Sequence, residues 1–172
     1  SELAAMVLLA GGAGTDTLRL VTAQNLSTEW TKVSSIERIE IAGDQGVYSL
    51  TLGATAAAAF TLPLTISAAN MQAAVLNLQA TDFTGALDVT GGAGNDTLRG
   101  GSAADIIQGG AGSDTIIGGQ GKDTLTGGDG KDTFVFASGD TGASTSTADT
   151  ITDLQIGDRI DLSALVGGSI SS

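Results

Sequence analysis

The sequence predicts an all-β protein built as a solenoid of short rungs. Apolar and polar residues alternate along several short segments of the first 90 residues, and five contiguous nine-residue frames follow from Gly91 to Val135. Alternation with a period of two is typical of half-buried strands, and a fixed repeat length is typical of stacked coils. We therefore expect irregular β-solenoid rungs in residues 1–90, a regular repeat coil in residues 91–136, and a capping segment and tail in residues 137–172.

The strand-like segments of the first 90 residues are less regular than the frames. Their apolar positions alternate in residues 18–21, 36–41, 47–52, 60–66, 75–78 and 87–89. Several of these segments lie about eleven to fourteen residues apart with Gly, Asn or Asp between them, which fits successive rungs of a solenoid. A sandwich of two sheets is the alternative for this part of the chain.

Three local features of the first 90 residues predict particular structures. Pro63 interrupts an alternating run and predicts a strand edge or the corner of a rung. The alanine-rich residues 54–59 and 68–74 predict bends or short helices. Residues 11–19 read Gly-Gly-Ala-Gly-Thr-Asp-Thr-Leu-Arg and form a sixth frame that stands alone. Because a metal site needs a neighbouring rung to complete it, we do not expect Asp16 to be a ligand.

Most of the five contiguous frames read Gly-Gly-x-Gly-x-Asp-x-apolar-x. The sixth position holds the aspartates Asp96, Asp105, Asp114, Asp123 and Asp132, and the eighth holds the apolar residues Leu98, Ile107, Ile116, Leu125 and Phe134. Glycine-rich turns can direct backbone carbonyls toward one point, and calcium takes about six to eight oxygen ligands from carbonyls and carboxylates. The chain has no histidine or cysteine to hold zinc or copper. The frames therefore predict several bound calcium ions.

A flexible linker is the alternative interpretation of these frames, because glycine and aspartate are common in linkers and turns. A linker has no need of Leu, Ile or Phe in every frame. The phased apolar position therefore favours a folded coil.

The charge of the chain argues against several classes of function. The net charge is −12, and residues 91–161 hold eleven aspartates against four basic residues. Such a surface repels nucleic acid and anionic membranes and attracts divalent cations. No apolar run is long enough to span a bilayer, and the first residues lack the basic region of a signal peptide. The absence of His and Cys removes the usual nucleophilic sites, so we do not expect an enzyme.

The residues after the last frame are expected to end the coil. Phe134-Val135-Phe136 is followed by a Ser/Thr/Gly-rich loop at 137–148 and then by two short strand-like segments within 149–163. An uncapped solenoid exposes its core and unpaired backbone, so these segments are expected to close the open end. The start without Met suggests a piece of a longer chain.

The frames, together with Asp132-Thr133-Phe134-Val135-Phe136 and the segment 149–163, resemble the C-terminal module of the RTX (repeats-in-toxin) family. The first 90 residues are loosely similar to RTX-type S-layer and surface proteins. The resemblance implies a right-handed parallel β-roll with a short C-terminal cap and several Ca²⁺ ions. It also implies a secreted or cell-surface protein that folds on extracellular calcium after type I secretion and that self-associates in a surface lattice. The alternative is an accessory module that binds polysaccharide beside an extracellular enzyme.

The family pattern also implies ligand sets, since two frames make one coil and each calcium lies between one frame and the second frame after it. Only the aspartates at the sixth position use side chains; the other residues lend carbonyls. The first set joins Gly92, Gly94 and Asp96 to Gly109, Ala111 and Asp114. The second joins Gly110, Gly112 and Asp114 to Gly127, Asp129 and Asp132. The third joins Gly101, Ala103 and Asp105 to Gly118, Gln120 and Asp123. The fourth joins Gly119, Gly121 and Asp123 to Asp140 and Asp149.

One frame departs from the family pattern at its fourth position. Ala103 stands where glycine is expected, and a left-handed conformation there would cost about 1–2 kcal/mol. We therefore expect the third site to be the weakest of the three complete ones.

Overall fold

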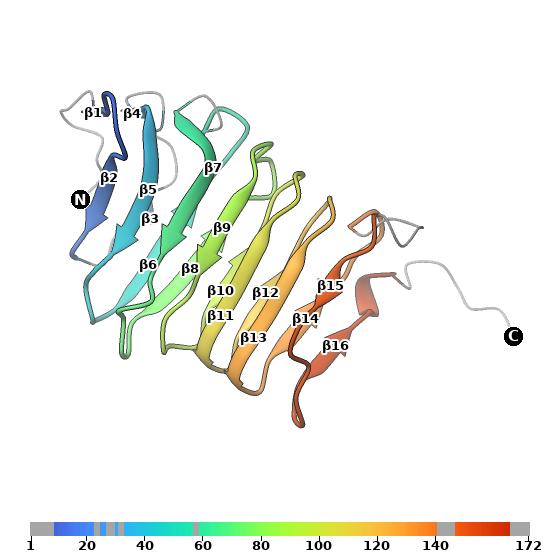
Figure 1. Ribbon diagram of the computed structural model, residues 1–172. Helices are drawn as coiled ribbons and strands as arrows, with labels where there is room; N and C mark the ends of the chain where they lie inside the picture. Colours follow the sequence, from blue (N-terminus) through green and yellow to red (C-terminus); the bar gives the residue numbers. More distant parts are fainter. Residues whose placement is uncertain are drawn as a thin grey trace, which may run out of the picture.

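A computed structural model describes residues 9–22, 25–26, 30, 33–56, 59–140 and 147–165. The described chain winds as a parallel β-roll, in which the strands alternate between two facing sheets along the length of the molecule (Figure 1). All pairings between strands are parallel. Parallel neighbours exclude the sandwich alternative, because sandwiches are built from antiparallel sheets.

In the part of the chain that the structure describes, each of the two large sheets has seven strands. The first sheet runs in the order β15-β13-β11-β9-β7-β5-β2, with β2 Thr17–Leu20, β5 Ile36–Ile41, β7 Phe60–Ser67, β9 Leu87–Thr90, β11 Ile106–Gly112, β13 Thr124–Gly130 and β15 Thr150–Ile151. The second runs β16-β14-β12-β10-β8-β6-β3, with β3 Asn25–Leu26, β6 Val47–Thr51, β8 Val75–Gln79, β10 Thr97–Arg99, β12 Thr115–Ile117, β14 Thr133–Val135 and β16 Arg159–Asp161. A small third sheet pairs β1 Leu9–Ala10 with β4 Val33–Ser34, and a 3₁₀ turn, η4 Ser163–Leu165, follows β16.

The length of one coil follows from the register of neighbouring strands. In the frames, Leu98 pairs with Ile116, and Ile107 pairs with Leu125, so that each residue pairs with its equivalent two frames further on. Two frames therefore make one coil, as the resemblance implied. Coils of the first half are longer, as the pairing of Leu50 with Leu78 shows. Most extra residues lie in the turns, and β7 also holds extra residues where its pairing with β5 shifts register.

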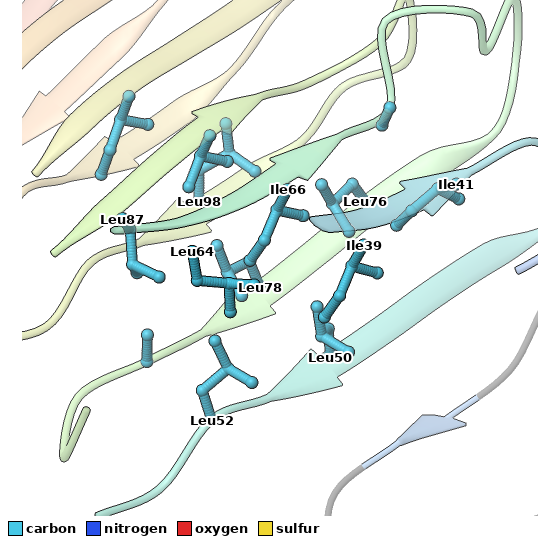
Figure 2. Packing of buried hydrophobic residues seen from close by; sticks show 14 of the residues in the cluster. Ile39, Ile41, Leu50, Leu52, Leu64, Ile66, Leu76, Leu78, Leu87 and Leu98 are labelled. Atoms are coloured by element: carbon cyan, nitrogen blue, oxygen red, sulfur yellow. The ribbon is translucent and has the colours of Figure 1, made fainter. Parts of the chain in front are cut away.

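The core lies between the two large sheets and is richest in the first half. Period-two alternation turns every second residue inward, so that β8 buries Leu76 and Leu78 completely. Figure 2 shows these side chains packed among the inward residues of β5, β6 and β7. From Leu98 onward each frame contributes one large apolar side chain, and Leu98, Ile107, Ile116, Leu125 and Phe134 are all fully buried.

The structure shows where the proline and the alanine-rich segments of the first half lie. Pro63 lies inside β7, exposed to solvent, where the pairing with β5 shifts register between Ile36 and Arg38. A proline fits this irregular stretch because no ladder hydrogen bond requires its nitrogen. The described alanine-rich residues form tight turns at corners of the coil, where Ala59 N donates to Ala56 O and Met71 N donates to Ala68 O.

The last two strands extend both sheets instead of folding across the open end. β15 pairs with β13 through Thr150 and Thr124, and β16 pairs with β14 through Ile160 and Phe134. The stretch of chain between paired residues, from Thr124 to Thr150 and from Phe134 to Ile160, is longer than two frames. Within the described residues, no helix is long and apolar enough to cross a membrane.

Two positions of β6 test the packing of the first half. Leu50 is 1% exposed and Val47 is 52% exposed. In calcium, we expect Leu50→Ala to lower the free energy of unfolding by about 2–5 kcal/mol, because it leaves a cavity between the sheets. Val47→Ala should cost below about 1 kcal/mol. Urea unfolding followed by circular dichroism measures both, and equal losses would contradict the described orientation of β6.

Candidate metal centre

The frames stack into two columns of turns, one on each side of the roll. Frames that open at Gly91, Gly109 and Gly127 form the first turn column, and those that open at Gly100 and Gly118 form the second. Backbone hydrogen bonds join successive members, since Ala111 N donates to Gly92 O and Gln120 N donates to Gly101 O, both at 2.9 Å. Each frame therefore lies directly against the second frame after it.

Aspartates at the sixth position form a ladder along each turn column. In the first aspartate ladder, the Oδ1 atom of each carboxylate after the first accepts a hydrogen bond of 2.8–2.9 Å from the backbone N–H of the aspartate one coil earlier, and the first accepts one from Leu76 N. Its members are Asp96, Asp114, Asp132 and Asp158. The second aspartate ladder repeats the arrangement with Asp105, Asp123 and Asp149. Each carboxylate thus holds two coils in register.

Burial makes these carboxylates hard to ionise. The five aspartates of the frames are at most 1% exposed. Loss of hydration is the largest cause and raises the pKa of Asp114 and of Asp123 to about 7 and that of Asp105 to about 6. Backbone hydrogen bonds oppose the shift, and the charges of ladder neighbours add to it at Asp114 and Asp123. No positive charge is among the causes of these shifts, and a nearby positive charge would favour the ionised carboxylates.

The first two aspartates differ from the later three in how their second oxygen is used. The Oδ2 atom of Asp96 accepts a hydrogen bond from Gly92 N, and that of Asp105 accepts one from Gly101 N, both at 2.8 Å. The Oδ2 atoms of Asp114, Asp123 and Asp132 are buried and accept no hydrogen bond. A buried charged oxygen without a partner lowers the stability of a fold, so we expect a cation beside these three atoms.

The backbone of the turns changes at the same point. Gly110 and Gly112 take positive φ angles of 116° and 115°, and the equivalent glycines of the next two frames are also positive. Gly92 and Gly94, at the same positions one coil earlier, are not among the glycines with positive φ. The reason lies in what each turn stacks on. The frame at Gly91 rests on the irregular turn at Met71, whereas the frame at Gly109 rests on another glycine-rich turn.

Backbone carbonyls lie close around the later turns. A side chain at Gly110 would collide with the carbonyl oxygen of Gly92, and one at Gly128 would collide with that of Gly110. No group of three or more acidic side chains converges within the described part of the chain. A metal held here must therefore take most of its ligands from backbone carbonyls. Hard oxygen donors of this kind fit calcium.

The structure brings the two halves of each expected ligand set next to each other. The residues at positions one to four of the first column, including Gly92, Gly94, Gly109, Ala111, Gly127 and Asp129, lie in adjacent stacked turns, as do Gly101, Ala103, Gly118, Gly119, Gln120 and Gly121 of the second. Asp129 is exposed, and its backbone pairs with that of Ala111. The ligand sets themselves remain predictions.

The end of the second column carries the two acidic residues assigned to the fourth set. Asp149 Oδ1 accepts a hydrogen bond from Asp123 N, and the charge of Asp140 helps to raise the pKa of Asp123. Asp140 itself accepts a hydrogen bond from Ala137 N at 2.7 Å. Both therefore lie near the Asp123 carboxylate.

The expected strain at Ala103 is absent. Ser35 is the one non-glycine residue with positive φ in the described ranges, so Ala103 is not left-handed. The expectation failed because it assigned one backbone conformation to all frames, although the frame at Gly100 stacks on the irregular turn at Phe83. Asp105 nevertheless differs from Asp123, since both of its oxygens already accept backbone hydrogen bonds.

Two aspartates of the last coil were missed from the sequence. Asp158 continues the first ladder, and both Asp153 oxygens accept hydrogen bonds of 2.8 Å, from Gly127 N and Gly128 N. A sequence signal for Asp158 exists, because Asp158-Arg159-Ile160 repeats the Asp-x-apolar triplet of Asp132-Thr133-Phe134.

The stray frame at residues 11–19 does have a neighbouring rung. Asp16 Oδ2 accepts a hydrogen bond from Gly12 N, and Asp16 N donates to Glu37 Oε2, both at 2.7 Å. Glu37 thus takes the position that an aspartate holds in the ladders. Gly12 is exposed and Asp16 is half-buried, in contrast to the enclosed frames.

Comparison with known protein families identifies the repeats. Residues 90–125 and 108–141 match the RTX calcium-binding nonapeptide repeat, whose family model comprises four copies. A comparison with curated proteins gives no match. The segment 90–141 therefore consists of RTX repeats, which bind several Ca²⁺ ions and are in general structural, non-catalytic modules.

Substitution of Gly110 tests the turn conformation. Gly110→Ala combines a positive φ with a collision against the Gly92 carbonyl, so we expect it to destabilise the calcium-bound protein by about 1–3 kcal/mol. Gly12→Ala is the matched control, because the same position of the stray frame has open space around it and no positive φ. Thermal unfolding in calcium measures the difference, and equal melting temperatures would argue against the described turn.

The raised pKa values predict how calcium-free protein responds to acid. Because the folded state holds protons more tightly than the unfolded chain, stability without calcium should rise as pH falls from 8 through about 7 toward 5. Calcium affinity should fall over the same range, since protons compete for the carboxylates. Circular dichroism of calcium-depleted protein across this range tests the sign, and a β-sheet signal that drops on acidification would show it to be wrong.

Proposed function

We propose that this chain is a calcium-folded structural module of a secreted or cell-surface bacterial protein. Its repeats order when they meet extracellular calcium after type I secretion. The observation that carries the proposal is the set of buried, unpartnered Oδ2 atoms of Asp114, Asp123 and Asp132 within RTX repeats.

The ions would be held between successive members of each turn column. In the first column, Asp114 and Asp132 would supply side-chain oxygens, with carbonyls from positions such as Gly110, Gly112 and Gly127. In the second column, Asp123 would act with Asp140 and Asp149. Bound calcium would supply the positive charge that the ladders lack. Asp96 and Asp105, whose oxygens are already used, would contribute to weaker sites.

Coupling of folding to calcium follows from how little core the repeats contain. One large apolar side chain per frame is fully buried, and glycine-rich turns lose much conformational entropy on ordering. Without a cation, each ladder also stacks like charges one coil apart. Binding energy then becomes folding energy, and a site at a hundred times its dissociation constant adds about 2.7 kcal/mol.

The three parts of the chain would have different roles. Residues 1–90 carry most of the buried apolar side chains and would form the rungs that need no calcium. Residues 91–136 would form the calcium-dependent roll on top of them. Residues 137–172 would form the last coil and the end of the roll.

The calcium requirement sets where such a module folds. Extracellular calcium modules typically have dissociation constants of about 10⁻⁴–10⁻³ M, far above cytosolic calcium. The repeats would therefore stay unfolded during export through a narrow channel and fold outside. RTX repeat proteins are typically secreted, which supports this location.

The polysaccharide-binding alternative gains no support from the structure. Sugar-binding faces use exposed aromatic rings, yet Trp30, Tyr48 and all four phenylalanines of this chain are buried.

Substitution of ladder aspartates separates the two kinds of site. Asp114→Asn removes a charge that serves two coils, so we expect it to raise the calcium midpoint about tenfold, equivalent to about 1.4 kcal/mol. Asp96→Asn should have a smaller effect, and Asp129→Asn, at an exposed position, should have almost none. Calcium titrations followed by circular dichroism test the order; three equal midpoints would refute it.

Hydrogen exchange tests the division between the halves. In chelator, amides of β5 to β9 should remain protected because apolar packing holds them, while amides of residues 91–135 should exchange quickly. Calcium should protect the repeats and change the first half little. Uniform protection of the whole chain in chelator would contradict calcium-coupled folding.

A further inference from the structure

We propose that the C-terminal end of the roll is a docking surface for a second copy of this chain. The surface, called the end surface below, comprises β15, β16 and the apolar residues Leu154, Ile156, Ile160 and Leu162. The two copies meet across a twofold axis, and their end strands pair antiparallel, β16 with β16 and β15 with β15.

Apolar side chains are unusually exposed at this end. Leu154 is 55% exposed, Ile156 is 104%, Ile160 is 44% and Leu162 is 48%. Ile160 is the inward-facing residue that stacks on Phe134, which is fully buried. Its exposure arises because no further coil covers β16 within the described residues. Covering it removes apolar surface from water and so favours association.

The backbone at both end strands offers a symmetric pairing site. Arg159 N donates to Asp132 O, and Asp161 O accepts from Phe136 N, so these residues direct their backbone groups toward β14. The N–H and C=O of Ile160 between them therefore face outward. β15 repeats this pattern, since Thr150 and Thr152 donate to the preceding coil and Ile151 faces outward.

A strand that offers one outward residue is suited to pair with itself. In an antiparallel ladder, the two opposed residues of each hydrogen-bonded pair exchange both backbone hydrogen bonds. Ile160 opposite Ile160 of the second copy meets this condition, as does Ile151 opposite Ile151. β15 and β16 end the two facing sheets at the same end of the roll (Figure 1), so a second copy stacked end to end meets both strands.

Charges beside Ile160 make the pairing self-complementary. Arg159 and Asp161 lie on the outer face of β16, where they form an ion pair of 3.4 Å within one chain. Antiparallel pairing centred on Ile160 places Arg159 of each copy opposite Asp161 of the other. The four charges then alternate in sign and cancel, which favours this register over a shifted one.

Other acidic groups at this end are held by hydrogen bonds to the previous coil. Asp149, Asp153 and Asp158 each accept hydrogen bonds from backbone amides of the previous coil. These bonds hold the three residues against the previous coil. A twofold contact of this kind is closed, so it yields a dimer and no fibre.

Charge reversal tests the proposal on the 172-residue chain in calcium-containing buffer. Analytical ultracentrifugation should find a dimer for the unaltered chain. Arg159→Asp and Asp161→Arg should each halve the mass, because four like charges then meet. An equimolar mixture of the two variants should regain the dimer, and the double variant Arg159→Asp/Asp161→Arg should dimerise by itself.

Circular dichroism in calcium checks that every variant keeps the β-sheet signal of the unaltered chain. A monomeric unaltered chain at every concentration would overturn the proposal, including the case in which residues 166–172 cover the end surface. Single variants that remain dimeric would overturn it as well, since the copies would then associate through another surface. Failure of the mixture to recover the dimer would exclude the antiparallel register.

Discussion

The structure depends on the burial of aspartate carboxylates in two ladders between stacked turns. Each carboxylate accepts the backbone N–H of the coil before it and so sets how the coils lie on one another. The same burial removes hydration and places like charges one coil apart, which raises the pKa of Asp114 and Asp123 to about 7. The group that aligns the roll therefore also destabilises it at neutral pH. A fold with this property is conditional on protons or on a cation, and the oxygen-rich turns make calcium the fitting cation.

The two halves of the chain solve the same packing problem by different means. In the first half, long turns accompany a dense apolar core, and coil lengths vary because surface turns tolerate insertions and because β7 holds extra residues where its pairing with β5 shifts register. In the repeats, turns are so short that they stack directly, and little space remains between the sheets for more than one large side chain per frame. Short turns are what bring carbonyls and carboxylates of successive coils together. Metal binding and a thin core are thus two results of one change in turn length.

The regular part of the fold was predictable because it is encoded locally. The apolar position of each frame predicted the inward residues, and the family resemblance implied the coil of two frames. The predictions that failed concern residues whose structure depends on the neighbouring coil. Gly92 and Gly110 share one motif yet differ in backbone, because one rests on the turn at Met71 and the other on a glycine turn. Asp158 was not predicted as a ladder residue because the longer connection before it breaks the nine-residue period. Only the Asp-x-apolar triplet is kept there.

The last coil of a parallel roll leaves an open backbone edge that the repeats themselves do not cover. Each coil covers the backbone edge of the one before, so the last coil must leave its own edge open or find another cover. The β15 and β16 strands continue the sheets and thus move the open edge outward without removing it. A head-to-tail partner would need to match β15 and β16 to the unlike strands β2 and β3, and such stacking would not terminate. Pairing of identical ends requires only that one strand complement itself, and the order Arg-Ile-Asp in β16 meets that condition.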